Sequence, residues 1–454
     1  MRLCVPGHGG GAYAPAALER ALERFDAWQL DWTEVAGLDD LAFPSGPIQA
    51  AERRLAAAFG AHDAAILVGG STAGILAAVL ACARGARVAM APTQHRSVYA
   101  ALALAGAEPV FLPERTDPAT GLALGVDWGA GAAETLRATR PALAIVAHPT
   151  YQGVAGPLAP LTEAAHALGT LVLADSAHGA HFGLDPRLPP PALDQGADIA
   201  VLGLHKSLGA LTQTAALAWR DTVDGAPVRA ALRLIQSSSP SYLLMASADA
   251  AREAMVRSGR ARWRAALDRA ERVRGLLSDE LWQPDVRQDP SRVVWLAPAG
   301  TGQDIVRALR ASDVEAEYAD ERFALLLVGP NLSSGDVPRL ERAVRRARSA
   351  FGALTDRAAP PAAILPPMLP DGAGMLAALT GAWDAVALVD SVGRVAADFL
   401  VPYPPGVPAA LPGARLDAAV VDRLARALAW GQEVQGVHEG STIRVVRTEG
   451  GASA

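Results

Sequence analysis

Lys206 is the residue of this chain with the most distinctive chemistry. Of the 41 lysine and arginine residues, 40 are arginine and Lys206 is the single lysine. A guanidinium group serves salt bridges and phosphate contacts at least as well as an ammonium group does. Only the lysine amine, however, can lose its proton, attack a carbonyl carbon and form an imine. Lys206 therefore indicates covalent chemistry, with chance survival in an arginine-rich chain as the alternative.

Asp175 is expected to lie close to Lys206. It closes the apolar run 170–175, and Lys206 follows the run 198–203. Ligands of open α/β sheets bind beyond the carboxyl ends of the strands, so both side chains should face one site. A carboxylate there is costly without a partner, which could be a cationic ring nitrogen or a metal ion. An aspartate that caps the next turn is the structural alternative.

A metal site is also conceivable, because His178 and His181 are three residues apart. No cluster of cysteines or carboxylates supplies the remaining ligands in the sequence, and this argues against it.

Two further segments could bind an anion and a planar ring. In "GGSTAG" (69–74), Ser71 or Thr72 can cap a helix while free backbone N–H groups contact a phosphate. A plain capped helix explains this segment equally well. His95, in "PTQHRSVY" after another strand, could stack on a flat ring. The alternative for His95 is a surface residue.

These residues together fit one cofactor, pyridoxal 5'-phosphate. It requires a lysine for its imine, a carboxylate that keeps its pyridine nitrogen protonated, an anion site for its phosphate and a flat group over its ring. Lys206, Asp175, the 69–74 segment and His95 supply these four groups.

The elements that must position these residues read as an α/β fold. Short apolar runs alternate with helical patterns, which is typical of a mostly parallel sheet with helices on both faces. We predict a seven-stranded sheet from residues 64–68, 86–91, 109–112, 142–147, 170–175, 198–203 and 214–219. Helices are expected at 72–83, 96–105, 130–139 and 158–168.

The chain divides into five predicted parts. They are an N-terminal segment (1–60), a large cofactor-binding α/β domain (61–245), a small α+β domain (246–355), a Pro-rich linker (356–371) and a C-terminal unit (372–454). In the small domain, strands are expected at 292–297 and 323–329, with helices near 302–311 and 335–350.

Composition narrows the function. The chain is 51% hydrophobic and 19% charged, with a net charge of −6, and its arginines are scattered. This argues for a globular protein and against a nucleic-acid or anionic-membrane partner. Two cysteines, Cys4 and Cys82, make no disulfide framework, and with no signal peptide we expect a cytoplasmic location. The uncharged stretch 64–83 has the length of a membrane span, but its central Gly-Gly-Ser-Thr favours a strand, turn and helix.

The sequence resembles the Orn/Lys/Arg decarboxylase family of fold-type I pyridoxal-phosphate-dependent enzymes. The resemblance covers most of the first 250 residues and part of the last 60. Its motifs are "PGHGGG" (6–11), "LDDLAFPSGPIQAAERRLAAAFGA" (38–61), "GGSTAGI" (69–75), "HRSVYAAL" (95–102), "PTYQGV" (149–154), "DSAHGAHFG" (175–183), "HKSLGALTQ" (205–213), "SSSPSYLLMASADAAR" (237–252) and "PYPPGVP" (402–408).

The resemblance implies a role for each site residue. Lys206 would carry the imine, Asp175 would hold the pyridine nitrogen, and His95 would stack on the ring. Phosphate contacts would come from Ser71, Thr72 and His205, and His178 would lie near the 3'-oxygen of the cofactor. Family members pair their subunits, which implies a homodimer or higher homo-oligomer in which residues 237–242 reach the neighbouring cofactor.

The chain departs from the family pattern at four positions. Ser176 stands where a glutamate is frequent, and Gly203 stands where a serine binds the phosphate. His148 replaces a serine, and Ala414 replaces an acidic residue. The changes at His148 and Ala414 weaken the inference of a basic substrate.

The leading functional hypothesis is a pyridoxal-phosphate-dependent amino-acid decarboxylase. It would convert arginine, lysine or ornithine, in that order of expectation, to its amine and CO2, as in polyamine biosynthesis. One alternative is transamination or β-elimination on the same fold. Another is a cofactor-binding protein without turnover, which the retention of Lys206 argues against.

Overall fold

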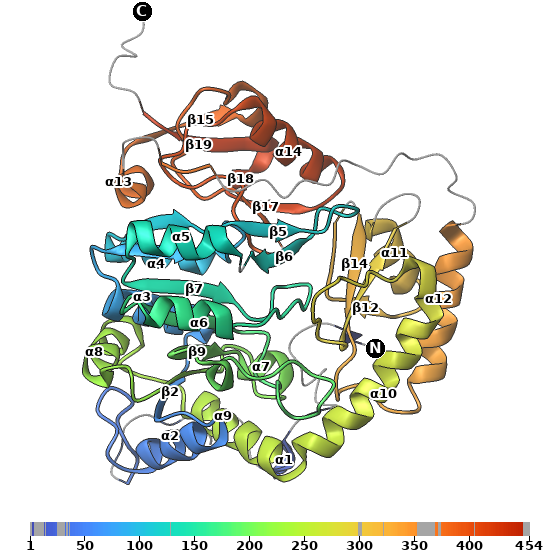
Figure 1. Ribbon diagram of the computed structural model, residues 1–454. Helices are drawn as coiled ribbons and strands as arrows, with labels where there is room; N and C mark the ends of the chain where they lie inside the picture. Colours follow the sequence, from blue (N-terminus) through green and yellow to red (C-terminus); the bar gives the residue numbers. More distant parts are fainter. Residues whose placement is uncertain are drawn as a thin grey trace, which may run out of the picture.

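The centre of the molecule is a seven-stranded sheet in the order β2-β10-β9-β8-β7-β3-β4 (Figure 1). The computed structural model describes residues 2–3, 13, 15–24, 32, 35, 37–127, 129–297, 302–320, 322–351, 368–370, 374–403 and 405–447. The strands of the sheet are β2 (Asp63–Leu67), β3 (Arg87–Met90), β4 (Glu108–Phe111), β7 (Leu143–Ala147), β8 (Leu171–Ser176), β9 (Ile199–Leu202) and β10 (Ala215–Trp219). Only β10 is antiparallel to its neighbours. The predicted sheet is therefore confirmed.

Helices cover both faces of this sheet, as the apolar strands predicted. Alternate residues of each strand point to opposite faces, so that Leu173 and Val172 enter different cores. One face packs against α3 (Gly70–Cys82), α4 (Arg96–Ala105) and α8 (Gly225–Ile235). The other packs against α2 (Pro47–Ala58), α5 (Ala130–Thr139), α6 (Ala159–His166) and α9 (Tyr242–Ala254).

The uncharged stretch 64–83 contributes to both layers. Its first part belongs to β2 and its second part is α3, and the two pack against each other in the core. Within the described part of the chain, no helix has the length and apolar character that crossing a membrane requires.

A smaller unit lies beside the carboxyl ends of the main strands (Figure 1). A π-helical segment, η3 (Met255–Gly259), joins α9 to α10 (Arg260–Leu277), which leads into a three-stranded sheet ordered β11-β14-β13. After α10, the elements of this smaller unit are β11 (Arg292–Leu296), α11 (Gly302–Arg310), β12 (Glu315–Ala316), β13 (Tyr318–Ala319), β14 (Phe323–Leu327) and α12 (Val337–Phe351). The strands and helices expected here from the sequence are present.

The N-terminal residues join this small unit. Strand β1 (Arg2–Leu3) pairs in parallel with β12, and Leu3 is buried in the core of the unit. Helix α1 (Ala16–Arg24) contacts α9. The motif at 6–11 lies outside the described residues.

The C-terminal unit packs over α4 (Figure 1), and a short hairpin adjoins β7 of the main sheet. The hairpin, which the sequence analysis did not predict, consists of β5 (Glu114–Thr116) and β6 (Ala123–Val126). The unit contains α13 (Met375–Thr380), β15 (Trp383–Ala387), β16 (Val401–Tyr403), α14 (Ala418–Ala429), β17 (Glu433–Gln435), β18 (Val437–His438) and β19 (Thr442–Val446). Of the linker predicted at 356–371, residues 368–370 alone are described.

Candidate active site

A cavity of about 650 Å³ opens at the carboxyl ends of the parallel strands. Asp175 is the penultimate residue of β8, Ala147 ends β7, and Lys206 follows β9. The small unit adds Glu317, Tyr318 and Asp320, and the C-terminal unit adds Tyr403 and residues of α14. The cavity is therefore built by three parts of the chain that are distant in sequence.

Lys206 lies in the single-turn helix α7 (Leu204–Ser207), immediately after β9. Its Nζ is 2.9 Å from Nε2 of His178. Burial lowers the pKa of Lys206 to about 8, against the opposing effect of the Asp175 carboxylate, and the positive charge of Arg292 lowers it further. A neutral amine is consequently well populated near neutral pH.

Asp175 faces the same cavity, as its place at the carboxyl end of an apolar strand predicted. Its Oδ1 accepts a hydrogen bond from the backbone N–H of Ala177 at 3.1 Å. Burial raises the pKa of Asp175, whereas Lys206 lowers it. A single backbone hydrogen bond does not offset the cost of burying a carboxylate. The Asp175 carboxylate could therefore accept a further hydrogen bond from a cationic ligand in the cavity.

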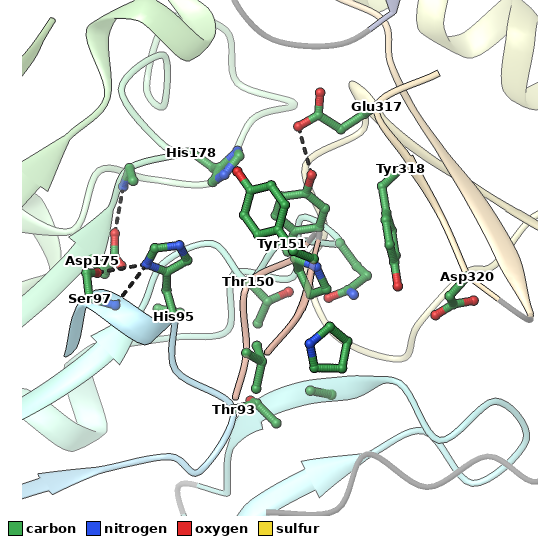
Figure 2. Close-up of a pocket in the computed structure, with 18 of the residues that line it drawn as sticks. Thr93, His95, Ser97, Thr150, Tyr151, Asp175, His178, Glu317, Tyr318 and Asp320 are labelled. Carbon is green, nitrogen blue, oxygen red and sulfur yellow. Dashed lines mark hydrogen bonds between the residues drawn. The ribbon is translucent and has the colours of Figure 1, made fainter. Parts of the chain in front are cut away.

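His178 and His95 both present rings to the cavity (Figure 2). The ring of Tyr151 meets His178 edge to face, with ring centroids 5.1 Å apart. His95 is the N-cap of α4, and its Nδ1 accepts a hydrogen bond from the N–H of Ser97. Burial lowers the pKa of His95 to about 4, so its ring is neutral and carries its proton on Nε2.

The 69–74 segment differs from the prediction in one respect. The N-cap of α3 is Gly69, and no side chain caps the helix, so the expected cap by Ser71 or Thr72 is wrong. The hydroxyl oxygen of Ser71 is instead buried without a hydrogen-bond partner among the described residues. Ser71, Thr72 and His205 all line the cavity. The Nδ1 of His205 donates to the backbone oxygen of Thr214 at 2.9 Å, which orients the ring.

The residues that the small unit contributes to the cavity were not among the sequence predictions. Glu317 lies between β12 and β13, Tyr318 begins β13, and Asp320 follows β13. These strands have two residues each and show no periodicity in the sequence. The hydroxyl of Tyr151 donates to Glu317 at 2.9 Å, and the Tyr151 ring also contacts that of Tyr318 (Figure 2). The sequence feature that could have pointed to these residues is a cluster of acidic and aromatic side chains in an otherwise arginine-rich segment.

Two of the four departures from the family pattern lie away from the cavity. His148 is 1% exposed, and its Nε2 is 3.1 Å from the backbone oxygen of Pro190. Ala414 is fully buried in the C-terminal unit, where its backbone oxygen accepts from Ala396. Neither residue lines the cavity.

The other two departures lie beside the lysine. A Cβ atom at Gly203 would come within 2.3 Å of the backbone oxygen of Ala177, so this backbone leaves no room for a side chain there. The hydroxyl of Ser176 is buried without a hydrogen-bond partner among the described residues. The missing serine at Gly203 thus has a steric reason.

His181 does not join His178 at the cavity. Its Nε2 contacts Asp289 at 3.0 Å, and its ring stacks on Trp263 with centroids 3.9 Å apart. In the described parts of the chain, no three His, Cys, Asp or Glu side chains are grouped as metal ligands would be.

The chain is similar to known decarboxylases over most of its length. Residues 1–292 match the family described as Orn/Lys/Arg decarboxylase, major domain, and residues 361–442 match Orn/Lys/Arg decarboxylase, C-terminal domain. The arginine decarboxylase of Bacillus subtilis (strain 168) is 30% identical over 98% of this chain and 93% of its own length.

Solved structures share the fold. The E. coli constitutive lysine decarboxylase is 21% identical, with a TM-score of 0.75 over 98% of this chain and 79% of the other. The serine palmitoyltransferase of Sphingomonas wittichii is 17% identical, with a TM-score of 0.61 over 78% of this chain and 88% of the other. These likenesses confirm the predicted fold class.

Proposed function

The chain belongs to the Orn/Lys/Arg decarboxylase family, and on that premise we propose that it converts arginine to its amine and CO2, with pyridoxal 5'-phosphate bound beside Lys206. Membership makes it a carboxy-lyase acting on a basic amino acid. Arginine is placed before lysine and ornithine because relatives at 28–30% identity are arginine decarboxylases. The observation that carries the proposal is the meeting of the single lysine with Asp175 in one cavity.

The cavity offers what pyridoxal 5'-phosphate requires. The buried Ser71 hydroxyl without a partner lies in the first turn of α3, where backbone N–H groups also lack partners within the helix. A phosphate group would satisfy both kinds of donor, since helix N-termini favour anions. We assign phosphate binding to Ser71, Thr72 and His205.

Lys206 is the residue that would hold the cofactor covalently. With a pKa of about 8, its amine is neutral in about one molecule in ten at pH 7. An ordinary lysine is neutral in only about one molecule in 2,500 at that pH. Lys206 is therefore ready to react without a separate base.

Asp175 would keep a proton on the pyridine nitrogen. When bound with that proton, the cofactor withdraws electrons from the α-carbon of the substrate and so allows the carboxylate to leave as CO2. The neutral ring of His95 would cover the face of the cofactor, and His178 would contact its 3'-oxygen. These assignments are supported by the presence of all three side chains in one cavity.

The small unit would select the basic substrate. Glu317 and Asp320 place two carboxyl groups in the cavity beside the aromatic rings of Tyr151 and Tyr318. A guanidinium group pairs with a carboxylate through two parallel hydrogen bonds and also stacks on aromatic faces. We therefore assign recognition of the substrate side chain to Glu317, with Asp320 as a second acceptor.

The test is a panel of amino acids incubated with the purified chain and pyridoxal 5'-phosphate, with CO2 and products measured. Agmatine and CO2 in equal amounts from arginine would support the proposal, and Lys206→Arg is the inactive control. Preference for lysine or ornithine would correct the substrate. Keto acid or ammonia without CO2 would overturn decarboxylation.

We also propose that the chain forms a homodimer or a higher homo-oligomer. Residues 237–242 do not line the cavity of their own chain, although the family resemblance gives them a role at a cofactor. They would serve the cavity of a second copy. Light scattering of the purified chain would test this, and a monomer would contradict it.

A further inference from the structure

Three side chains from three elements form a continuous hydrogen-bonded row beside the cavity. His178, in the loop after β8, lies between Lys206 of α7 and Arg292, the first residue of β11. Its Nε2 is 2.9 Å from Lys206 Nζ, and its Nδ1 is 2.6 Å from Nη2 of Arg292. The row therefore joins the small unit to the lysine.

The proton positions in this row follow from chemistry. A guanidinium group has only donors, so Nδ1 of His178 must accept. Burial, together with the permanent positive charge of Arg292, holds the pKa of His178 well below its usual value, so the ring is neutral. A neutral imidazole has one N–H, which must then be on Nε2. That N–H points at Lys206, and because an ammonium group cannot accept a hydrogen bond, this arrangement favours the neutral amine over the ammonium form.

We propose that Arg292 is a positioning residue: it fixes the proton of His178 on Nε2, and that N–H shifts Lys206 towards its neutral amine form. The inference rests on the proposed function, because it concerns the readiness of Lys206 to bond an aldehyde. It adds a residue to the site that does not line the main cavity.

Arg292 is held firmly enough for this task. It is 3% exposed, and its stem packs on Gly153, where a Cβ atom would come within 2.6 Å of Arg292 Cγ. Gly153 also has a φ of +90°, which disfavours other residues. The nearest acidic partner of Arg292 is Asp289, at 3.8 Å from Nε, and Asp289 is shared with His181. The short contact to His178 is thus its closest side-chain hydrogen bond.

Other charged groups around the row raise or lower the pKa values of Lys206 and His178. Asp175 and Glu317 raise the pKa of Lys206, while burial and Arg292 lower it. His205 and His95 lower the pKa of His178 together with Lys206 and Arg292. The test must therefore separate the hydrogen bond from the simple charge of Arg292.

The single lysine makes such a test possible. In the cofactor-free full-length chain, Lys206 and the N-terminus are the only primary amines that acetic anhydride can label, and peptide mass spectrometry distinguishes the two. The labelling rate across pH gives the pKa of Lys206. Arg292→Met should raise it by about 1 to 3 units, which slows labelling at pH 7 about tenfold or more. Arg269→Met, a half-buried arginine of α10, is the matched control and should cause no shift.

A double-mutant cycle separates the two explanations. If the hydrogen bond acts through the histidine, Arg292→Met should cause little further shift in a His178→Phe background. Arg292→Lys keeps a donor-only cation and should restore the low pKa, and its new lysine falls in a different peptide. No shift on Arg292→Met, or an equal shift in both backgrounds, would overturn the proposal.

A second measurement needs no variant at Arg292. In the chain labelled with ¹³C,¹⁵N-histidine, the resonances of His178 are those lost in His178→Phe. Their shifts should show the Nε2–H tautomer, and the Nδ1–H tautomer would refute the assignment. Neither readout uses turnover, so failure of the inference and failure of the decarboxylase proposal are distinguishable by CO2 release from the wild-type chain.

Discussion

Asp175→Asn should change cofactor attachment and turnover in opposite directions. Asparagine keeps the shape of the side chain and the acceptor for the N–H of Ala177. It removes the negative charge that raises the pKa of Lys206. It also removes the group proposed to pair with the pyridine nitrogen. The first effect favours the neutral amine, and the second removes the electron-withdrawing form of the cofactor.

The magnitudes follow from the pKa of about 8 for Lys206. Loss of a facing opposite charge lowers such a pKa by about 1 to 3 units, which raises the neutral fraction at pH 7 from about one tenth to about one half or more. Attachment should then be about fivefold faster. Leaving a buried cation without its partner costs about 3 to 5 kcal/mol, which corresponds to a loss of turnover of about 100-fold to several thousand-fold.

Stopped-flow absorbance after mixing with pyridoxal 5'-phosphate measures attachment, and CO2 release measures turnover. Asp185→Asn is a suitable control, because Asp185 is a buried aspartate that pairs with Arg187 and does not line the cavity. Normal turnover in Asp175→Asn would refute the role at the pyridine nitrogen. Slower attachment would refute the electrostatic reasoning about Lys206.

Three further predictions test separate parts of the structure. Lys206→Arg should keep the fold and the charge but lose both the visible absorbance of bound cofactor and all CO2 release; surviving absorbance would contradict covalent attachment at Lys206. Glu317→Gln still accepts from Tyr151 but loses its charge, so the KM for arginine should rise about 10- to 100-fold, as expected for a charged hydrogen bond, with a smaller change in kcat; an unchanged KM would exclude Glu317 from substrate recognition. Asp39 accepts backbone N–H groups of Ser45, Gly46 and Ile48, and although burial alone would raise its pKa, such bonds lower it. This stabilisation is present above the unfolded pKa near 4 and is lost as pH falls through the folded value. Urea unfolding should therefore show Asp39→Asn less stable by about 1–3 kcal/mol at pH 7, with the difference shrinking below about pH 4, and an equal difference at pH 3 would contradict the assignment.

The meeting of Lys206 and Asp175 could be predicted because parallel strands place their carboxyl ends at one edge of a sheet. The apolar runs that form β8 and β9 are long enough to identify as strands. A residue at the carboxyl end of such a strand therefore lies at the same edge of the sheet as the end of the strand. For the same reason Ser71 was predicted to face the site, whereas the place of His178 near the cofactor came from the family resemblance.

The contributions of the small unit could not be predicted in this way. Glu317 lies between two-residue strands, and its approach to Tyr151 depends on how the small unit packs against the large one. Arg292 carries no motif that distinguishes it among 40 arginines, and its contact with His178 joins residues 114 positions apart. The structure also reassigned a cap, since Gly69 rather than Ser71 or Thr72 precedes α3.

The sequence by itself determined the strands of the main sheet, the family and the identity of the reactive amine. These depend on local apolar patterns and on residue types, which are properties of short segments. Only the tertiary structure decided which charges surround that amine, where the proton of His178 lies and which acidic groups can meet a substrate. Those properties depend on burial and on distances between segments that pack together, because desolvation and hydrogen bonding act through space rather than along the chain.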